Sequence, residues 1–367
     1  MKKYFSRILI IFSITLFIFI IFNILISYSW RYYNNYKYNN YNPFISEVRE
    51  AYNLSKKDQS ILHKETHNLK YEYIPYLGAV PKNYKGQFVN FNSNYGRKVD
   101  NNKTCNKKIF FFGGSTTFGW LNEDYNSIPA LFKKILDGNL DNYCVFNFGS
   151  PWFFSKQENI YLLNLIEKKF KPDFAFFIDG INETCHGYNY SKNFKESFSE
   201  INTEHRTLIF NKKITPLIKS LPAYQLSDRL RGNIVNFKFD ADSNCNSNEK
   251  VEDLFDLRIK FRVELCNSHE ITCLTFLQPF GGVHGNIYPA TNKDFIDTMN
   301  KRYNSLKKIE KNSNFSQIKN NFKKNIFDIS GVFKNDKKIY YVDNVHYSNY
   351  GNQLIANEIY KIFNENR

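Results

Sequence analysis

From residue 107 onward, short and mostly apolar runs alternate with longer segments in which apolar residues recur every three or four positions. The runs predict strands at 109–112, 145–148, 174–178, 272–277 and 326–329. The longer segments predict helices at 128–136, 159–170, 251–266, 297–310 and 353–363. Continuously apolar strands separated by helices are typical of a parallel sheet that is covered on both faces. We therefore predict an α/β fold, a three-layer α/β/α sandwich around a mainly parallel central sheet.

The N-terminus carries an almost unbroken apolar stretch over residues 8–26. About 20 such residues suffice to cross the hydrocarbon layer of a bilayer. Lys2, Lys3 and Arg7 precede the stretch, which favours a cytoplasmic N-terminus and an extracytoplasmic remainder. A cleaved signal peptide is the alternative, but the stretch lacks an Ala-x-Ala site and is followed by aromatic residues typical of a membrane interface. We predict a single transmembrane anchor over residues 1–30.

The remainder divides into two parts by composition. Residues 31–104 contain a Tyr/Asn-rich tether to residue 45, helical spacing over 46–70, and a turn-rich stretch over 71–99 that predicts a short hairpin extension. Residues 105–367 carry the alternating strands and helices. Within this domain a mostly polar insert spans about 185–250, and it is expected either to cover the strand ends as a lid or substrate wall, or to form a loop.

The charge pattern argues against nucleic acid as a partner. The formal net charge is +15, but Lys and Arg are spread along the chain without a long basic block. We expect a basic solvated surface, compatible with an anionic membrane or cell wall.

Six cysteines in an exported domain permit disulfides. Their positions suggest Cys105–Cys144 and Cys266–Cys273, which leaves Cys185 with Cys245; free buried thiols are the alternative. No CxxC pair exists, so a zinc ribbon is not expected.

Three polar or small residues follow three consecutive strands. Ser115 comes after Gly113-Gly114, and Gly149 and Asn182 follow the next two strands. Because the carboxyl ends of parallel strands share one edge of the sheet, these residues are expected to lie together.

Asp343 and His346 stand just before the last helix. With Ser115 they supply a nucleophile, a base and a residue that orients the base, as in serine hydrolases. This chemistry needs no metal or organic cofactor.

Four segments resemble the motifs of the SGNH (GDSL-like) hydrolase superfamily, whose fold is flavodoxin-like, over roughly residues 105–365. They are Gly113–Gly119, Asn147–Ser150, Asp179–Glu183 and Asp343–His346. The resemblance implies a Ser115 nucleophile, an Asp343–His346 pair, and an oxyanion hole made by the main-chain amides of Ser115 and Gly149 and the Asn182 side chain.

Two positions depart from the usual motifs of that superfamily: Gly114 and Glu183 both stand where aspartate is usual. The G-G-S form resembles that of cell-envelope members.

The resemblance implies an enzyme that cleaves ester bonds, acting on an acylated small molecule or on O-acyl groups of envelope or secreted glycans. O-acyl transfer by the same triad is one alternative. A non-catalytic glycan-binding or assembly protein on this scaffold is another. His186 is expected to belong to the insert, with substrate contact as the alternative, and Gln278-Pro279 either lines the site or ends a strand.

Overall fold

The computed structural model describes most of the chain outside the insert. The described residues are 2–40, 46–101, 105–139, 143–183, 221–222, 251–280, 303–304, 306–307, 325–333 and 338–366. The chain forms two compact units. Among the described residues, 2–40 and 221–222 belong to one unit, and 46–183 and 251–366 belong to the other.

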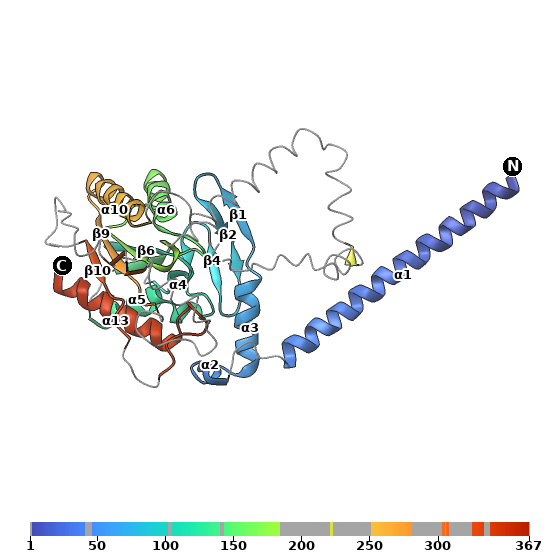
Figure 1. The fold of residues 1–367 in the computed structure, drawn as a ribbon, viewed down its shortest axis with the longest axis horizontal. Coiled ribbons are helices and arrows are strands. Elements are labelled where there is room, and N and C mark those ends of the chain that lie inside the picture. The colour runs from blue at the N-terminus through green and yellow to red at the C-terminus, as the bar shows by residue number, and fades with distance from the viewer. Residues whose placement is uncertain are drawn as a thin grey trace. The chain divides into compact units, whose positions relative to one another are not determined.

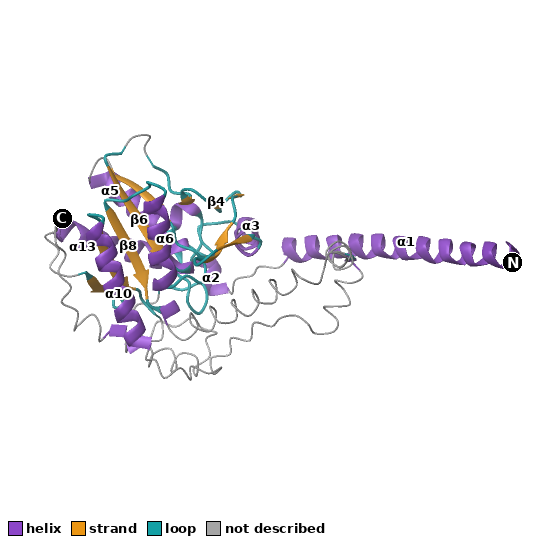
Figure 2. Cartoon of the chain, turned by 90° about the horizontal axis from the view of Figure 1, so that it is seen from above, coloured by secondary structure: helices purple, strands orange, loops and turns teal. Residues whose placement is uncertain are grey.

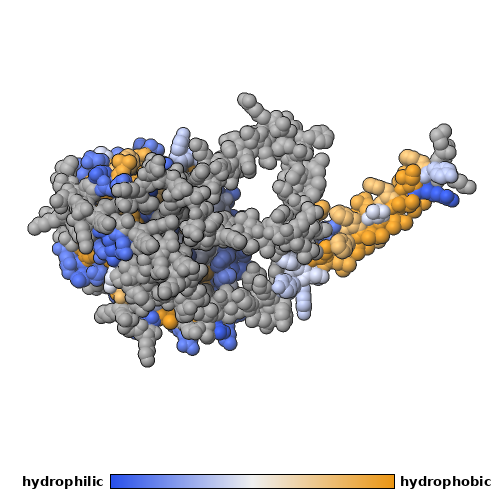
Figure 3. Space-filling model, viewed as in Figure 1, coloured by the Kyte–Doolittle hydropathy of each residue, from blue (hydrophilic) through white to orange (hydrophobic). Residues whose placement is uncertain are grey.

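In the first unit, helix α1 spans Lys2–Asn40. Its segment Tyr4–Trp30 is long and apolar enough to cross a membrane, and large apolar side chains are exposed along it (Figure 3). The boundary between anchor and tether at residue 30 stays a prediction, and the helix itself continues past it to Asn40. The reason is that no Gly or Pro occurs before Pro43 to end the helix.

The second unit is built around an eight-stranded sheet with the order β10-β9-β8-β6-β7-β5-β4-β3. The strands are β3 (Tyr84–Lys85), β4 (Asn90–Asn92), β5 (Gly96–Arg97), β6 (Lys107–Gly113), β7 (Tyr143–Asn147), β8 (Phe174–Asp179), β9 (Thr272–Leu277) and β10 (Ile326–Asp328). All pairs from β10 to β5 are parallel, whereas β4 and β3 continue the sheet in antiparallel pairing. The predicted mainly parallel α/β fold is confirmed.

Helices cover both faces of the sheet (Figures 1 and 2). They are α4 (Ser115–Phe118), α5 (Ile128–Asn139), α6 (Ser155–Glu167), α10 (Val251–Ser268) and α13 (Asn349–Asn366). Short 3₁₀ turns occur at η1 (Asp124–Asn126) and η2 (Ile181–Glu183). The predicted helix at 297–310 and the insert at 185–250 lie almost entirely outside the described residues.

Alternate residues of β6 fill the two cores. Phe110 and Phe112 belong to the cluster that includes side chains of α6 and α10, while Ile109 and Phe111 belong to the cluster that includes side chains of α5 and α13. All four are fully buried, and burying one such side chain contributes about 1.5–3 kcal/mol. The continuous apolar character of this strand therefore follows from its two-sided burial.

Residues 46–97 pack into the second unit. They form α2 (Ser46–Glu50), α3 (Lys56–His67), a separate hairpin of β1 (Tyr71–Ile74) and β2 (Gly78–Pro81), and then β3 to β5. Because β5 pairs with β7, the central sheet extends across the expected boundary at residue 105. Residues 84–97 are thus part of the main sheet, whereas the predicted hairpin is realised by β1 and β2.

Candidate active site

Ser115 is delivered by the end of the central strand. Strand β6 ends at Gly113, Gly114 is the N-cap, and Ser115 is the first residue of α4. An N–H group in the first turn of a helix has no acceptor within that helix. The half-buried Ser115 therefore offers a hydroxyl and a main-chain N–H at the carboxyl edge of the sheet.

His346 connects Ser115 to Asp343. Its Nε2 atom lies 2.8 Å from Ser115 Oγ, and its Nδ1 atom lies 2.7 Å from Asp343 Oδ2. The second carboxylate oxygen, Asp343 Oδ1, accepts the main-chain N–H groups of Val345 (2.9 Å) and His346 (2.8 Å). The structure thus brings Ser115 and His346 together, although they are 231 positions apart in sequence. The same turn that carries the His346 imidazole also holds the Asp343 carboxylate in place.

Asp343 is kept ionised by its neighbours. Burial raises its pKa, but the His346 imidazole and the N–H groups of Val345 and His346 outweigh this and lower the pKa below its usual value. A carboxylate in this position favours a proton on Nδ1, which leaves Nε2 to accept one from Ser115.

Asn182 lies against the turn that carries Ser115. Its Nδ2 group donates one hydrogen bond to the Phe153 carbonyl at 2.8 Å, which fixes the plane of the amide and leaves its second hydrogen for another acceptor. A Cβ atom on Gly114 would lie only 2.2 Å from this nitrogen. The glycine in place of the usual aspartate therefore makes the space that the Asn182 amide occupies.

Gly149 lies in the loop after β7, and its role in an oxyanion hole stays a prediction. Its N–H already donates to Asn147 Oδ1 at 3.0 Å. A Cβ atom at this position would lie 2.4 Å from the Phe118 nitrogen, so glycine is required for the loop after β7 to pack on α4. The geometry supports a packing role for Gly149, whereas the Ser115 N–H and the second amide hydrogen of Asn182 have no such internal acceptor among the described hydrogen bonds.

Trp120, which the sequence did not single out, lies beside the histidine. Its ring centroid is 6.0 Å from that of His346 and 5.3 Å from that of His67 on α3. Residues of the N-terminal extension therefore border the site, although no motif in the extension indicated this.

A buried arginine, also missed, holds the loop that follows α4. Arg97 donates to the carbonyls of Phe118, Gly119 and Asn122 and pairs with Asp124 at 2.9 Å. Asn122 in turn donates to the Tyr347 carbonyl at 3.0 Å, next to His346. Strand β5 is thereby connected through one loop to both the serine and the histidine segments.

Gln278 lies behind the nucleophile. The Thr116 hydroxyl donates to Gln278 Oε1 at 2.8 Å, and the Tyr347 hydroxyl donates to the Pro279 carbonyl at 2.6 Å. The segment after β9 therefore supports both halves of the site. His186 lies outside the described residues.

Two of the predicted disulfides, Cys105–Cys144 and Cys266–Cys273, are confirmed. The third predicted pair, Cys185–Cys245, lies outside the described residues. Within the described ranges, His, Cys, Asp and Glu do not gather in groups of three or more that could hold a metal ion.

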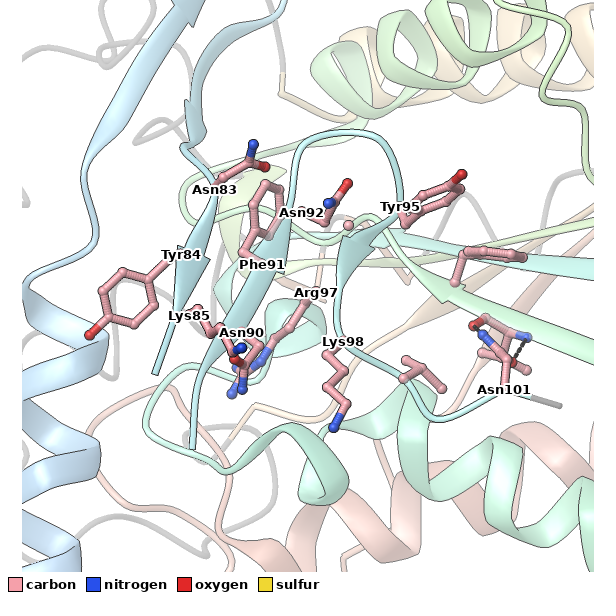
Figure 4. Close-up of a pocket in the computed structure, with 14 residues that line it drawn as sticks. Asn83, Tyr84, Lys85, Asn90, Phe91, Asn92, Tyr95, Arg97, Lys98 and Asn101 are labelled. Carbon is pink, nitrogen blue, oxygen red and sulfur yellow. Dashed lines mark hydrogen bonds between the residues drawn. The ribbon is translucent and has the colours of Figure 1, made fainter. Parts of the chain in front are cut away.

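A groove of about 720 Å³ lies along β3–β5, and it does not include the predicted site residues (Figure 4). Several of its polar side chains are engaged internally: Asn90 and Arg97 bind Asp124, and Asn101 binds both main-chain groups of Val145. The groove therefore offers fewer open polar groups than its composition suggests.

Comparisons with known proteins give structural similarity alone. No family model matches the chain, and no curated protein matches its sequence. Solved structures that resemble it include the acetyl xylan esterase AlAXEase (16% identity, 70% of this chain and 98% of that chain, TM-score 0.39). A lipolytic protein of the G-D-S-L family from Veillonella parvula (14%, 70% and 98%, TM-score 0.38) and the esterase EstA from a Pseudoalteromonas species (12%, 71% and 98%, TM-score 0.36) are further examples. At these values the reaction has to be inferred from this chain's own residues.

Proposed function

We propose that this chain is a membrane-anchored, extracytoplasmic serine esterase of the SGNH type. The observation that carries the proposal is the hydrogen-bonded line from the half-buried Ser115 hydroxyl through His346 to Asp343. A serine hydroxyl becomes an effective nucleophile when a positioned base removes its proton. The same three groups in this order make up the Ser-His-Asp triad that performs acyl transfer through serine.

In the proposed reaction, Ser115 Oγ attacks the ester carbonyl carbon while its proton moves to His346 Nε2. Asp343 stabilises the imidazolium that forms. The Ser115 N–H and the second amide hydrogen of Asn182 stabilise the negative oxygen of the tetrahedral intermediate. The intermediate collapses, the proton passes from His346 to the leaving alcohol, and an acyl-Ser115 ester remains. Water then attacks this ester by the same route and releases the carboxylic acid.

The substrate class that we propose is an O-acylated glycan of the cell envelope or a secreted one. Two features support an envelope location: helix α1, which is long enough to cross a membrane, and the two disulfides, which persist in oxidising compartments. The positive charges before the helix favour a cytoplasmic N-terminus.

The test is labelling of the detergent-solubilised full chain with a fluorophosphonate probe, which reacts with activated serines. We expect labelling that is lost in Ser115→Ala, together with a fall in kcat on a small ester of roughly 10⁴-fold or more. Ser127→Ala changes a buried serine whose hydroxyl donates to the Asp124 carbonyl, and this variant should label like the unchanged protein.

Folded protein that is not labelled at any pH between 6 and 9 would refute the proposal. For a labelled protein, acetate release from an acetylated oligosaccharide, measured with and without a sugar acceptor, separates hydrolysis from acyl transfer.

A further inference from the structure

Four charged side chains are buried between α6, α10, β8 and β9, and a fifth, Arg258, is partly exposed beside them. At their centre is Arg262, which is fully buried and donates to Asp179 (2.6 Å), Glu158 (3.1 Å), Asn159 (2.7 Å) and Thr275 (2.8 Å). The other two members of this buried charge cluster are Glu183 and Arg258, which pair at 3.2 Å. Burying charged groups costs free energy of folding unless each of them is paired and hydrogen-bonded.

The cluster has three carboxyl groups and two guanidinium groups. Burial raises the pKa of both Glu158 and Glu183, and the nearby Asp179 carboxylate raises both further. Asp179 pairs with Arg262, and Glu183 pairs with Arg258. The carboxyl oxygens of Glu183 can accept further hydrogen bonds besides the one from Arg258.

Glu183 uses that capacity to connect two loops next to the proposed oxyanion donor. Its carboxylate accepts the main-chain N–H of Ser155 and, at 2.7 Å, the Ser155 hydroxyl, both at the start of α6. One residue earlier, the Asn182 amide donates to the carbonyl of Phe153. Asn182 and Glu183, which follow β8, are therefore hydrogen-bonded to Phe153 and Ser155, which follow β7.

We propose that Glu183 is a positioning residue for Asn182. Held by Arg258 and by the N-terminus of α6, Glu183 fixes the η2 turn so that the free hydrogen of the Asn182 amide stays aimed at the oxyanion. Glutamate in place of the usual aspartate is one methylene longer, which suits a carboxylate that bridges to a neighbouring helix. This inference rests on the proposed function, because it assigns a role to Asn182 in that reaction.

The experiment is a double-mutant cycle of Glu183→Gln and Asn182→Ala on a small chromogenic ester. The side chain introduced by Glu183→Gln presents an NH₂ group to donors, so we expect kcat to fall about 10-fold with KM changed less than about twofold. Asn182→Ala alone should lower kcat about 100-fold. If Glu183 acts through Asn182, then Glu183→Gln should cause no further loss in the Asn182→Ala background.

Two further variants complete the test. Ser155→Ala removes one of the same hydrogen bonds from the opposite side, and it should lower kcat about two- to fivefold with the same coupling to Asn182, even if Glu183→Gln fails to fold. Glu158→Gln is the matched control, because it changes another buried carboxyl of the same cluster, one that binds Arg262 rather than Ser155; its kcat should stay within about twofold.

Additive losses in the cycle would overturn the positioning role and leave Glu183 as a structural residue only. Turnover that survives Ser115→Ala would instead refute the proposed function, so the two failures are distinguishable.

Discussion

The Asn182 amide can approach the turn before Ser115 because residue 114 has no side chain. Residue 114 has an ordinary backbone conformation for any amino acid, with φ −79°, so its need for glycine comes from the approach of the Asn182 amide. The glycine that replaces the usual aspartate in one motif is therefore explained by its contact with Asn182, which belongs to another motif.

We predict that Gly114→Ala lowers kcat on a small ester about 100-fold, because the added methyl group displaces the Asn182 amide from its position. KM should change little. The matched control is Gly138→Ala on α5, where a Cβ atom meets nothing within 4 Å; this change should leave kcat unaltered. Equal kcat values for the two variants, measured by ester hydrolysis, would contradict the assigned role of Gly114.

Sequence motifs located Ser115, Asp343, His346 and Asn182 because each stands at a strand end or helix start within a recognisable pattern. They did not locate Arg262. The chain has 50 Lys and Arg residues, and nothing local distinguishes a buried one. Its carboxylate partners, such as Glu158, are up to 104 positions away, so only the packed fold reveals them.

At the scale of single elements, α3 carries a pH-sensitive contact. Burial and the stacked ring of His67 lower the pKa of His63 to about 4, from an ordinary value of 6.5. The folded chain therefore resists protonation of His63, whereas the unfolded chain takes up the proton near pH 6.5. The stabilising contribution is complete above pH 6.5 and is lost as the pH falls toward 4.

We predict that the free energy of unfolding falls between pH 7 and pH 4.5 by about 1–2 kcal/mol more in the unchanged protein than in His63→Gln, after a discount for partial exposure of the ring. Urea unfolding at the two pH values measures the difference, and the comparison cancels the contributions of carboxylates. Parallel pH dependence in the two proteins would rule out His63 as the source.

The sequence predicted a strand well where its run of apolar residues was long. Strand β9 was predicted at its observed bounds because six consecutive buried residues leave a clear apolar run. Strands β3 and β5 have two residues each and carry no period that a sequence can display. Their place in the sheet depends on pairing with β4 and β7, which is a property of the whole fold.

At the scale of the whole molecule, the proposed membrane location depends on α1. We predict that the full chain stays in the membrane fraction after alkaline carbonate extraction, at the mass of the uncleaved chain. Phe17→Lys combined with Ile18→Lys should release most of it, since each lysine at the centre of a span costs about 2.5–3.5 kcal/mol. Phe17→Leu is the control. A chain shortened by about 30 residues would show instead that the helix is a cleaved signal.

The pairing of β5 with β7 has a consequence for solubility. Without residues 84–97, strand β7 would become the outer strand of the sheet, and its unpaired N–H and C=O groups would be a template for strands of other molecules. The short strands β3 to β5 cover the edge of β7 and so protect the protein from aggregation through that edge. They end the sheet with two brief antiparallel strands, which present too little backbone for a neighbouring chain to extend.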